Sequence, residues 1–365
     1  MKDGSGSFAE EQQGTLLPER PETSDSAGTQ MSTQTDRQEA AMRGAGSWIP
    51  VLANMANRFG LLASWLILIV IYSIMLPHVF LTASNFQTIF SSQAVLLVLT
   101  LGLLPALAAG EYDLSAAGVL GVSLVLVGWL NVVHGWPIVP TVLVAIAAGL
   151  VVGLLNALFI VLVGIDSIVV TLGMGTLLAG VAIGINNLSV GGISPQLVNF
   201  ASTQVFGLQL VFYYGLILTI LLWYLFAYTP LGRYLYFVGA GRSVARLTGI
   251  RVNLIRAGSL VVASVVAAVS GVLLAGVLGS ADPTTGPTFL LPAFASAFLG
   301  STTITPGRFN AWGSFIAVYF LVTGITGLEL LGFSGWIEQV FYGGSLVVAV
   351  LFSRLAGMKR TTGTA

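Results

Sequence analysis

A long stretch of this chain has no basic residue, and a cluster of arginines ends it. No lysine or arginine occurs between Arg58 and Arg233. Five arginines then follow within 24 residues: Arg233, Arg242, Arg246, Arg251 and Arg256. An arginine at the centre of a membrane helix costs about 2.5–3.5 kcal/mol, so five would cost roughly 12–18 kcal/mol in lipid. The cluster therefore lies outside the hydrocarbon. Because cytoplasmic loops carry the excess of Lys and Arg, it predicts a cytoplasmic loop over about residues 230–256.

The composition indicates a polytopic membrane protein. Of the 365 residues, 56% are hydrophobic and only 8% are charged, which is more apolar than a soluble domain of this length needs to be. Eight of the fourteen acidic residues lie in the first 39 positions. Residues 1–47 contain no sustained apolar run, so we expect a disordered polar tail there. A membrane domain is expected over residues 48–360, and a short C-terminal tail over residues 361–365.

Ten stretches of about 20 mostly apolar residues are candidate membrane spans. They fall near residues 59–77, 88–109, 114–133, 138–163, 167–187, 209–229, 257–280, 288–304, 310–329 and 336–355. The eighth of them is short and is broken by Pro292. Small residues four positions apart, such as Gly149 and Gly153, predict close helix packing. The expected fold is an all-α polytopic membrane protein of about ten transmembrane helices, with the cytoplasmic loop between the sixth and the seventh.

The number of spans is consistent with the distribution of charge. Arg43 and Arg58 indicate a cytoplasmic amino terminus, and six crossings then bring the arginine cluster to the cytoplasm. Four further crossings place the C-terminus in the cytoplasm as well. The remaining basic residues fall on that side: Arg308, Arg354, Lys359 and Arg360.

Several kinds of chemistry have no support in the sequence. The only lysines are Lys2 and Lys359, and neither is followed by Ser or Thr as a P-loop requires. The chain has two histidines and no cysteine, so no thiolate site and no paired-histidine metal site are expected. No serine lies in a G-x-S-x-G turn. We therefore expect a non-catalytic chain without a cofactor.

Three acidic residues interrupt the first hydrophobic block, namely Glu111, Asp113 and Asp166. All three map to predicted cytoplasmic turns, where Asp113 or Asp166 can cap the following helix. An ion-coupled transporter usually needs buried carboxylates or a basic partner at depth. Because the sequence offers few of these, an external source of energy is indicated.

Several short sequence motifs in this chain resemble those of a known protein family. The run Gly110–Ser115 reads like a G-G-I-D-L-S element with Glu111 in place of the usual glycine, and Asn156 and Val170–Gly173 read like N-G and V-T-L-G elements. Leu231–Gly239 and Ala245–Ile250 read like G-R-x-x-x-x-x-G and A-A-R-x-x-G-I elements. On these strings the chain resembles, over roughly residues 60–355, the permease subunits of ribose-type (carbohydrate uptake 2-like) ATP-binding cassette importers.

The resemblance implies a role for the basic loop. In that family the loop forms a short coupling helix that docks on the ATPase subunit. The role carries over to Arg233, Gly239, Arg242, Arg246, Gly249 and Arg251. Arginine forks pair well with carboxylates and aromatic faces at interfaces, and Gly239 and Gly249 can supply turns beside a short helix. The alternative is that the arginines only set topology or touch anionic lipid headgroups.

The leading hypothesis is the permease subunit of a bacterial importer for a monosaccharide or related polyol, in the inner membrane. The implied partners are a cytoplasmic ATPase subunit, a periplasmic solute-binding protein, a second permease subunit in a homodimer, and membrane lipid, with no nucleic acid. A neutral polyhydroxylated solute is held by hydroxyl and amide groups and needs few charges. The candidates for the translocation path are Asp113, Ser115, Asn156, Thr171 and Gly173.

Two other classes of protein remain as alternatives. A self-sufficient secondary transporter would move its solute on an ion gradient without any ATPase. A membrane-embedded enzyme is disfavoured because acid, base and metal constellations are missing from the sequence.

Overall fold

The computed structural model describes residues 48–333 and 335–361. The predicted tail over residues 1–47 and the last four residues lie outside this part. The chain divides into two units, Met1–Ala53 and Asn54–Ala365. Only the beginning of one helix is described in the first unit, and the account below concerns the second.

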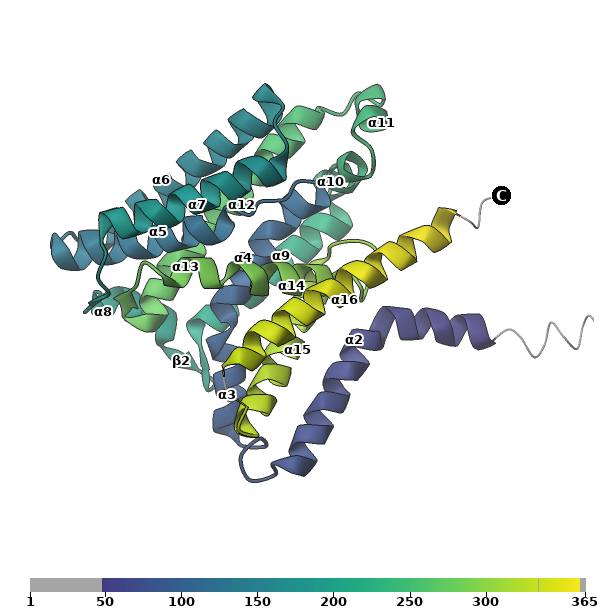
Figure 1. Cartoon of the computed structure of the whole chain (residues 1–365), viewed down its shortest axis with the longest axis horizontal. Helices are drawn as coiled ribbons and strands as arrows, with labels where there is room; N and C mark the ends of the chain where they lie inside the picture. The colour runs from purple at the N-terminus through teal and green to yellow at the C-terminus, as the bar shows by residue number, and fades with distance from the viewer. Residues whose placement is uncertain (1–47, 334, 362–365) are drawn as a thin grey trace, which may run out of the picture. The chain divides into compact units, whose positions relative to one another are not determined.

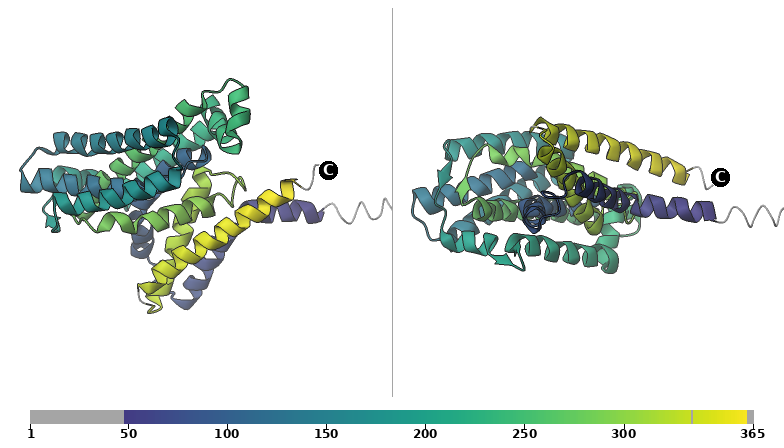
Figure 2. Two further views of the ribbon diagram at one scale, coloured as in Figure 1. Left: turned by 45° about the horizontal axis from the view of Figure 1, so that its top comes forward. Right: turned by 90° about the horizontal axis from the view of Figure 1, so that it is seen from below.

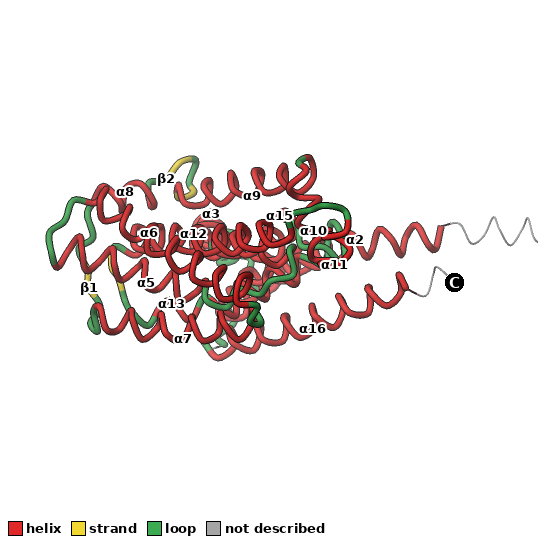
Figure 3. The backbone as a smooth tube through the Cα atoms, turned by 90° about the horizontal axis from the view of Figure 1, so that it is seen from above, coloured by secondary structure: helices red, strands yellow, loops and turns green. Residues whose placement is uncertain are grey.

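Helices dominate the described chain (Figures 1 and 3). Those before the arginine cluster are α2 (Trp48–Met75), α3 (Ala83–Ser92), α4 (Ala94–Ala108), α5 (Ala116–Gly128), α6 (Ile138–Ala157), α7 (Ser167–Ile185), α8 (Pro195–Ser202) and α9 (Leu210–Tyr228). Helices α5 and α6 continue into the π-helical turns η1 (Trp129–Val133) and η2 (Leu158–Val163). The later helices are α10 (Pro230–Ala240), α11 (Arg242–Leu247), α12 (Val252–Leu278), α13 (Thr285–Thr288), α14 (Leu290–Gly300), α15 (Ala311–Leu330) and α16 (Trp336–Thr361).

Four short strands form two antiparallel pairs in the described chain. Strand β1 (Val190–Gly191) pairs with β4 (Ser280–Ala281), and β2 (Gln204–Val205) pairs with β3 (Leu208–Gln209). The first pair joins the loop after α7 to the end of α12, so it fixes those two helix ends beside each other.

Eight segments within the described residues are helical, apolar and long enough to cross a membrane. They match eight of the ten predicted spans, and the all-α polytopic fold is confirmed. The match is not complete in detail, because the second span consists of α3 and α4, which meet at Gln93. The seventh begins at Val252, so Arg256 lies inside α12 and the basic loop ends earlier than predicted.

The predicted span over residues 288–304 is not a continuous membrane helix. Only α14 forms there, with 11 residues, and at 1.5 Å per residue it is about 16 Å long. The hydrocarbon core is about 30 Å thick. Residues 282–289 before α14 form turns and the single-turn helix α13. Gly286 in α13 approaches the middle of α5, since a Cβ on Gly286 would lie 2.6 Å from Gly121 Cα. Non-helical backbone at this depth is tolerated because it is enclosed by protein.

This close approach gives a testable consequence. In the variant Gly286→Ala, the new Cβ would also lie 2.9 Å from the carbonyl oxygen of Ala117, so the backbone of α5 or α13 must shift. We expect a loss of about 1–3 kcal/mol of stability, measured as thermal unfolding in detergent. The matched control is Gly180→Ala, because nothing lies within 4 Å of a Cβ at Gly180. Equal melting temperatures for the two variants would contradict the close approach.

Helices α4 and α12 form the interior of the bundle. All residues of α4 are buried, which explains why it is apolar on every side. Helix α12 packs against α4, α5 and α6, and α4 also contacts α9, α14 and α15 (Figure 2). Gly153 of α6 faces Val261 and Ser264 of α12, so the predicted close packing at Gly149 and Gly153 is confirmed for this pair of helices.

One end of the bundle collects the basic residues whose side chains the structure describes. The backbone N–H of Ile304 donates to the carbonyl oxygen of Arg58 at 2.8 Å. The hydroxyl of Tyr236 donates to the carbonyl oxygen of Phe309 at 2.5 Å. These bonds join the start of the first span, α10 and the loop over residues 301–310. We call this the arginine-rich end, and β1 and β4 lie at the opposite end.

Candidate functional site

The loop between α4 and α5, residues 109–115, enters the bundle at the arginine-rich end. Its backbone is bonded to the first turns of α7, because the N–H of Tyr112 donates to Ser167 Oγ at 3.3 Å and that of Leu114 to Thr171 Oγ1 at 3.0 Å. Gly110 has a φ of 77°, a conformation that glycine adopts without strain. The loop therefore has a defined conformation held by side chains from another helix.

A buried polar network lies directly behind this loop. Asp113 Oδ1 accepts from Ser115 Oγ at 2.5 Å and from the N–H of Ser115 at 3.0 Å. Its Oδ2 accepts from Ser264 Oγ of α12 at 3.4 Å. Asn156 Nδ2 of α6 donates to Ser115 Oγ at 2.8 Å. All four side chains are fully buried, so the network links α5, α6 and α12 inside the bundle.

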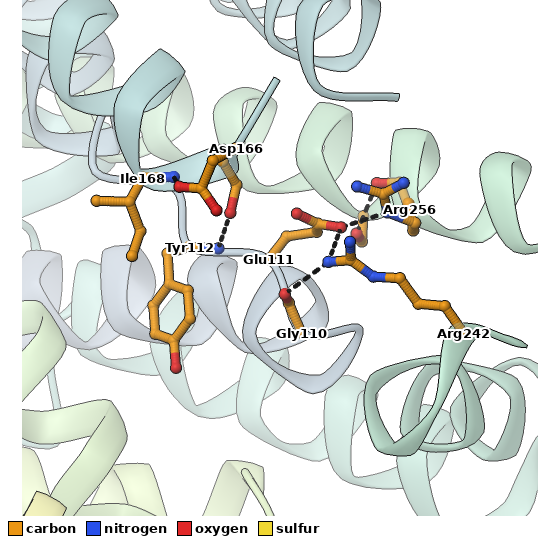
Figure 4. Close-up of polar contacts among 9 residues, drawn as sticks. Gly110, Glu111, Tyr112, Asp166, Ile168, Arg242 and Arg256 are labelled. Atoms are coloured by element: carbon orange, nitrogen blue, oxygen red, sulfur yellow. Dashed lines mark hydrogen bonds and ion pairs between the residues drawn. The ribbon is translucent and has the colours of Figure 1, made fainter. Parts of the chain in front are cut away.

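Asp113 lies in an enclosed polar environment and does not cap α5. Burial raises the pKa of this carboxyl above its usual value, because desolvation disfavours the charged form, while the bonds from Ser115 and Ser264 favour it. The prediction that Asp113 caps the following helix is wrong, because the N–H that it accepts from belongs to Ser115, which is itself the N-cap residue of α5. Asp166 caps its helix as predicted, since it accepts from the N–H of Ile168 at 2.9 Å (Figure 4).

Glu111 connects the same loop to the arginine cluster (Figure 4). Its Oε1 accepts from Arg242 Nη2 at 2.8 Å and also from Arg256 Nε. The Glu111 side chain is 1% exposed, whereas those of Arg242 and Arg256 are 48% and 12% exposed. Arg242 Nη2 also donates to the carbonyl oxygen of Gly110 at 3.2 Å. One enclosed carboxylate therefore holds α11 and α12 to the loop before α5.

A cavity of about 350 Å³ adjoins this ion pair. Glu111, Tyr112, Asp166, Arg242 and Arg256 contribute to its lining. The cavity is thus lined by both signs of charge, and the basic side chains that reach it are already paired.

The basic loop folds into two short helices, α10 and α11. Gly249 has a φ of 82° and supplies the predicted turn after α11. The prediction that Gly239 supplies a turn is wrong, because Gly239 lies inside α10. A Cβ at this position would clash with the carbonyl oxygen of Ala108, so glycine allows α10 to approach the end of α4 closely. The break between α10 and α11 falls instead at Gly241, which is extended.

The outer face of α11 combines charge with apolar surface. Arg246 is exposed, and Val244 and Leu247 are 56% and 88% exposed. The side chains of Arg233, Arg246 and Arg251 have no hydrogen bond or ion pair to any residue that the structure describes. Three of the five clustered arginines are therefore available to a partner, while the other two are engaged by Glu111.

The structure brings most of the predicted path residues together. Asp113, Ser115, Asn156 and Thr171 belong to one connected group around the loop, and none lines the 350 Å³ cavity. Gly173 lies apart on the exposed face of α7. The sequence reasoning missed Ser264 and did not pair Glu111 with Arg256. The departure of Glu111 from the pattern glycine marked this residue as unusual, but it did not indicate Arg256 as its partner.

Comparisons with known proteins point to transport. A family profile described as the permease component of the branched-chain amino acid transport system matches residues 85–350. The D-allose transport system permease protein AlsC of Escherichia coli (strain K12) is 27% identical over 300 residues, covering 82% of this chain and 92% of AlsC. The autoinducer 2 import system permease protein LsrD of Photorhabdus laumondii is 26% identical over 310 residues, covering 82% of this chain and 92% of LsrD. No solved structure matches the chain.

The family match extends from the second span into the last helix, and the relatives are transport permease subunits and not enzymes. With the apolar helices, these matches show a multi-pass inner-membrane protein. They also confirm the resemblance to permeases of ATP-binding cassette importers. The chain therefore belongs to the family of transport-system permease components that the profile over residues 85–350 describes.

Proposed function

We propose that this permease forms the translocation path for a monosaccharide or related polyol and is driven by a separate cytoplasmic ATPase. The names of two relatives support this solute class, since AlsC belongs to a D-allose system and LsrD to an autoinducer 2 system. A periplasmic solute-binding protein would deliver the solute.

The proposed coupling to the ATPase rests on one observation, the exposed outer face of α11. Arg246 offers a guanidinium, a group enriched at protein interfaces, beside the exposed apolar side chains of Val244 and Leu247. The ion pair between Arg242 and Glu111 connects this helix to the bundle. A displacement of α11 by the ATPase would therefore be transmitted to the loop before α5.

The coupling role is tested by charge reversal at Arg246. In proteoliposomes with the cognate ATPase and binding protein, Arg246→Glu is expected to lower ATP-driven uptake about tenfold, because an interface arginine is replaced by a repelling charge. Arg246→Lys is the matched control and retains more uptake, since it keeps the charge. Membrane insertion is checked by protease protection. Normal uptake by Arg246→Glu would defeat the coupling assignment.

The alternative of a secondary transporter is addressed by the same preparation. We expect no uptake by the purified chain when the ATPase is omitted and an ion gradient is applied. Uptake under that condition would favour an ion-coupled mechanism over the proposed one.

The proposed topology has ten crossings, with both termini in the cytoplasm. It counts residues 282–300 as one broken crossing and α16 as the last. The arginine-rich end then faces the cytoplasm, in accordance with the excess of basic residues there. We propose a homodimer in which each copy contributes Asp113, Ser115, Asn156, Thr171 and Gly173 to the path. Because four of these residues are enclosed here, their exposure to solute requires separation of α5, α6 and α12.

A further inference from the structure

A second cavity, of about 570 Å³, lies at the arginine-rich end between α9, α10 and the loop over residues 301–310. We call it the basic pocket. Its lining includes Arg58, Arg233, Arg308, Trp223, Tyr236 and Trp312. It is separate from the cavity at Glu111, with which it shares no lining residue.

The charge of the basic pocket is not compensated by its lining. Of the described residues that line it, three are arginines and none is acidic. No ion pair joins Arg58, Arg233 or Arg308 to any residue in the described part of the chain. Such a concentration of guanidinium groups favours an anion with several acceptor oxygens.

Aromatic side chains position two of these arginines. The guanidinium of Arg308 lies over the ring of Tyr236, 5.4 Å from its centroid, and that of Arg58 lies 5.5 Å from the ring of Phe59. Tyr236 is itself held by its bond to the carbonyl oxygen of Phe309. The lining is thus partly fixed before any ligand arrives, which reduces the entropy lost on binding.

The basic pocket adjoins an apolar face that belongs to a membrane span. Trp223 lines the pocket and is 39% exposed on α9. On the same helix, large side chains expose 46–60% of their area towards the surroundings: Ile217, Ile220, Leu221 and Tyr224. Tryptophan and tyrosine are enriched at the level of lipid headgroups. This arrangement suits a lipid whose headgroup enters the pocket and whose acyl chains follow α9.

We propose that the basic pocket binds the phosphate of an anionic phospholipid, whose acyl chains lie along the exposed face of α9. The phosphate supplies acceptor oxygens for Arg58, Arg233 and Arg308, and basic pockets between helices on the cytoplasmic side suit such headgroups. The volume is sufficient for a glycerophosphate headgroup, because it falls within the usual range of small-molecule sites. The acidic segment within residues 1–39 is the competing occupant.

The test is native mass spectrometry of the delipidated full-length protein after addition of phosphatidylglycerol or phosphatidylcholine. We expect preferential retention of phosphatidylglycerol. Arg58→Gln and Arg308→Gln should each lower its apparent affinity about fivefold, and Arg308→Lys should lower it less. The matched control is Arg251→Gln, which removes an exposed arginine outside the pocket and should leave lipid binding unchanged. Circular dichroism excludes unfolding of the variants.

Three results would overturn the proposal. The first is a failure of the expected selectivity, seen either as equal retention of the two lipids or as equal loss in the Arg251→Gln control. The second is displacement of phosphatidylglycerol by millimolar inorganic phosphate, which would assign the pocket to a soluble anion. The third is lipid selectivity that appears only after the eight acidic residues of the first 39 positions are neutralised, which would assign the pocket to the chain's own amino-terminal segment.

Discussion

Replacement of Glu111 by glutamine is expected to lower both stability and ATP-driven uptake severely. The substitution keeps the shape of the side chain but removes the charge that Arg242 and Arg256 share. Arg256 is 12% exposed, so its charge would remain largely enclosed without compensation. Removing one partner of a buried pair typically costs about 3–5 kcal/mol. Because α11 would lose its connection to the loop before α5, uptake should fall further than stability alone explains.

The measurements for Glu111→Gln are the melting temperature in detergent and uptake in proteoliposomes with the ATPase. The matched control is Glu329→Gln, an exposed carboxylate in the last turn of α15, and it should have little effect on either. A second comparison is the double variant Glu111→Gln with Arg256→Met, which removes the buried charge as well and should recover part of the lost stability. A single variant as stable and active as the unmodified protein would show that the ion pair has no role.

Replacement of Asp113 should separate a hydrogen-bonding role from a role of charge. Asp113→Ala leaves the N–H of Ser115 and the hydroxyls of Ser115 and Ser264 without their acceptor in a fully buried site. We expect a loss of about 3 kcal/mol or more. Asp113→Asn keeps an acceptor oxygen, and it removes a carboxylate whose charged form is disfavoured by burial. It should be tolerated much better than alanine.

The dependence on pH distinguishes these roles further. Burial raises the pKa of Asp113, so the folded protein binds a proton there more readily than the unfolded chain. The stability from this group is present at low pH and is lost as pH rises through the raised pKa. Melting curves measured upward from about pH 4, the usual pKa of an aspartate, should show the unmodified protein losing stability relative to Asp113→Asn as the pH rises. Parallel curves, or alanine and asparagine variants of equal stability, would contradict this account.

Much of the fold followed from local properties of the sequence. Hydropathy identified eight helices long enough to cross a membrane, because each such segment must satisfy its own backbone inside lipid. The sequence predicted that the span over residues 288–304 is short and broken by Pro292, but Pro292 lies in the first turn of α14 and the chain departs from helix on either side of α14. An apolar window measures composition and does not report the tertiary contacts of the segment, such as the approach of Gly286 to Gly121 just before α14.

The site was predictable only where neighbouring residues define it. The cap at Asp166 and the turn at Gly249 depend on a few consecutive positions, and the structure has both. The pair of Glu111 and Arg256 joins residues 145 positions apart. Their pairing is set by how α4, α5 and α12 pack, and nothing in the local sequence specifies it.

The sequence by itself determined that this is a helical membrane protein, and it predicts that the arginine cluster lies outside the lipid. The energetic reason is that an unpaired arginine in hydrocarbon is too costly, whatever the tertiary arrangement. Only the tertiary structure decided what each arginine does. Packing encloses Glu111 beside Arg242 and Arg256, leaves Arg246 exposed on α11, and gathers Arg233 with Arg58 and Arg308 around the basic pocket. These assignments depend on distances between helices that are remote in sequence, and such distances are set by side-chain packing across the whole bundle.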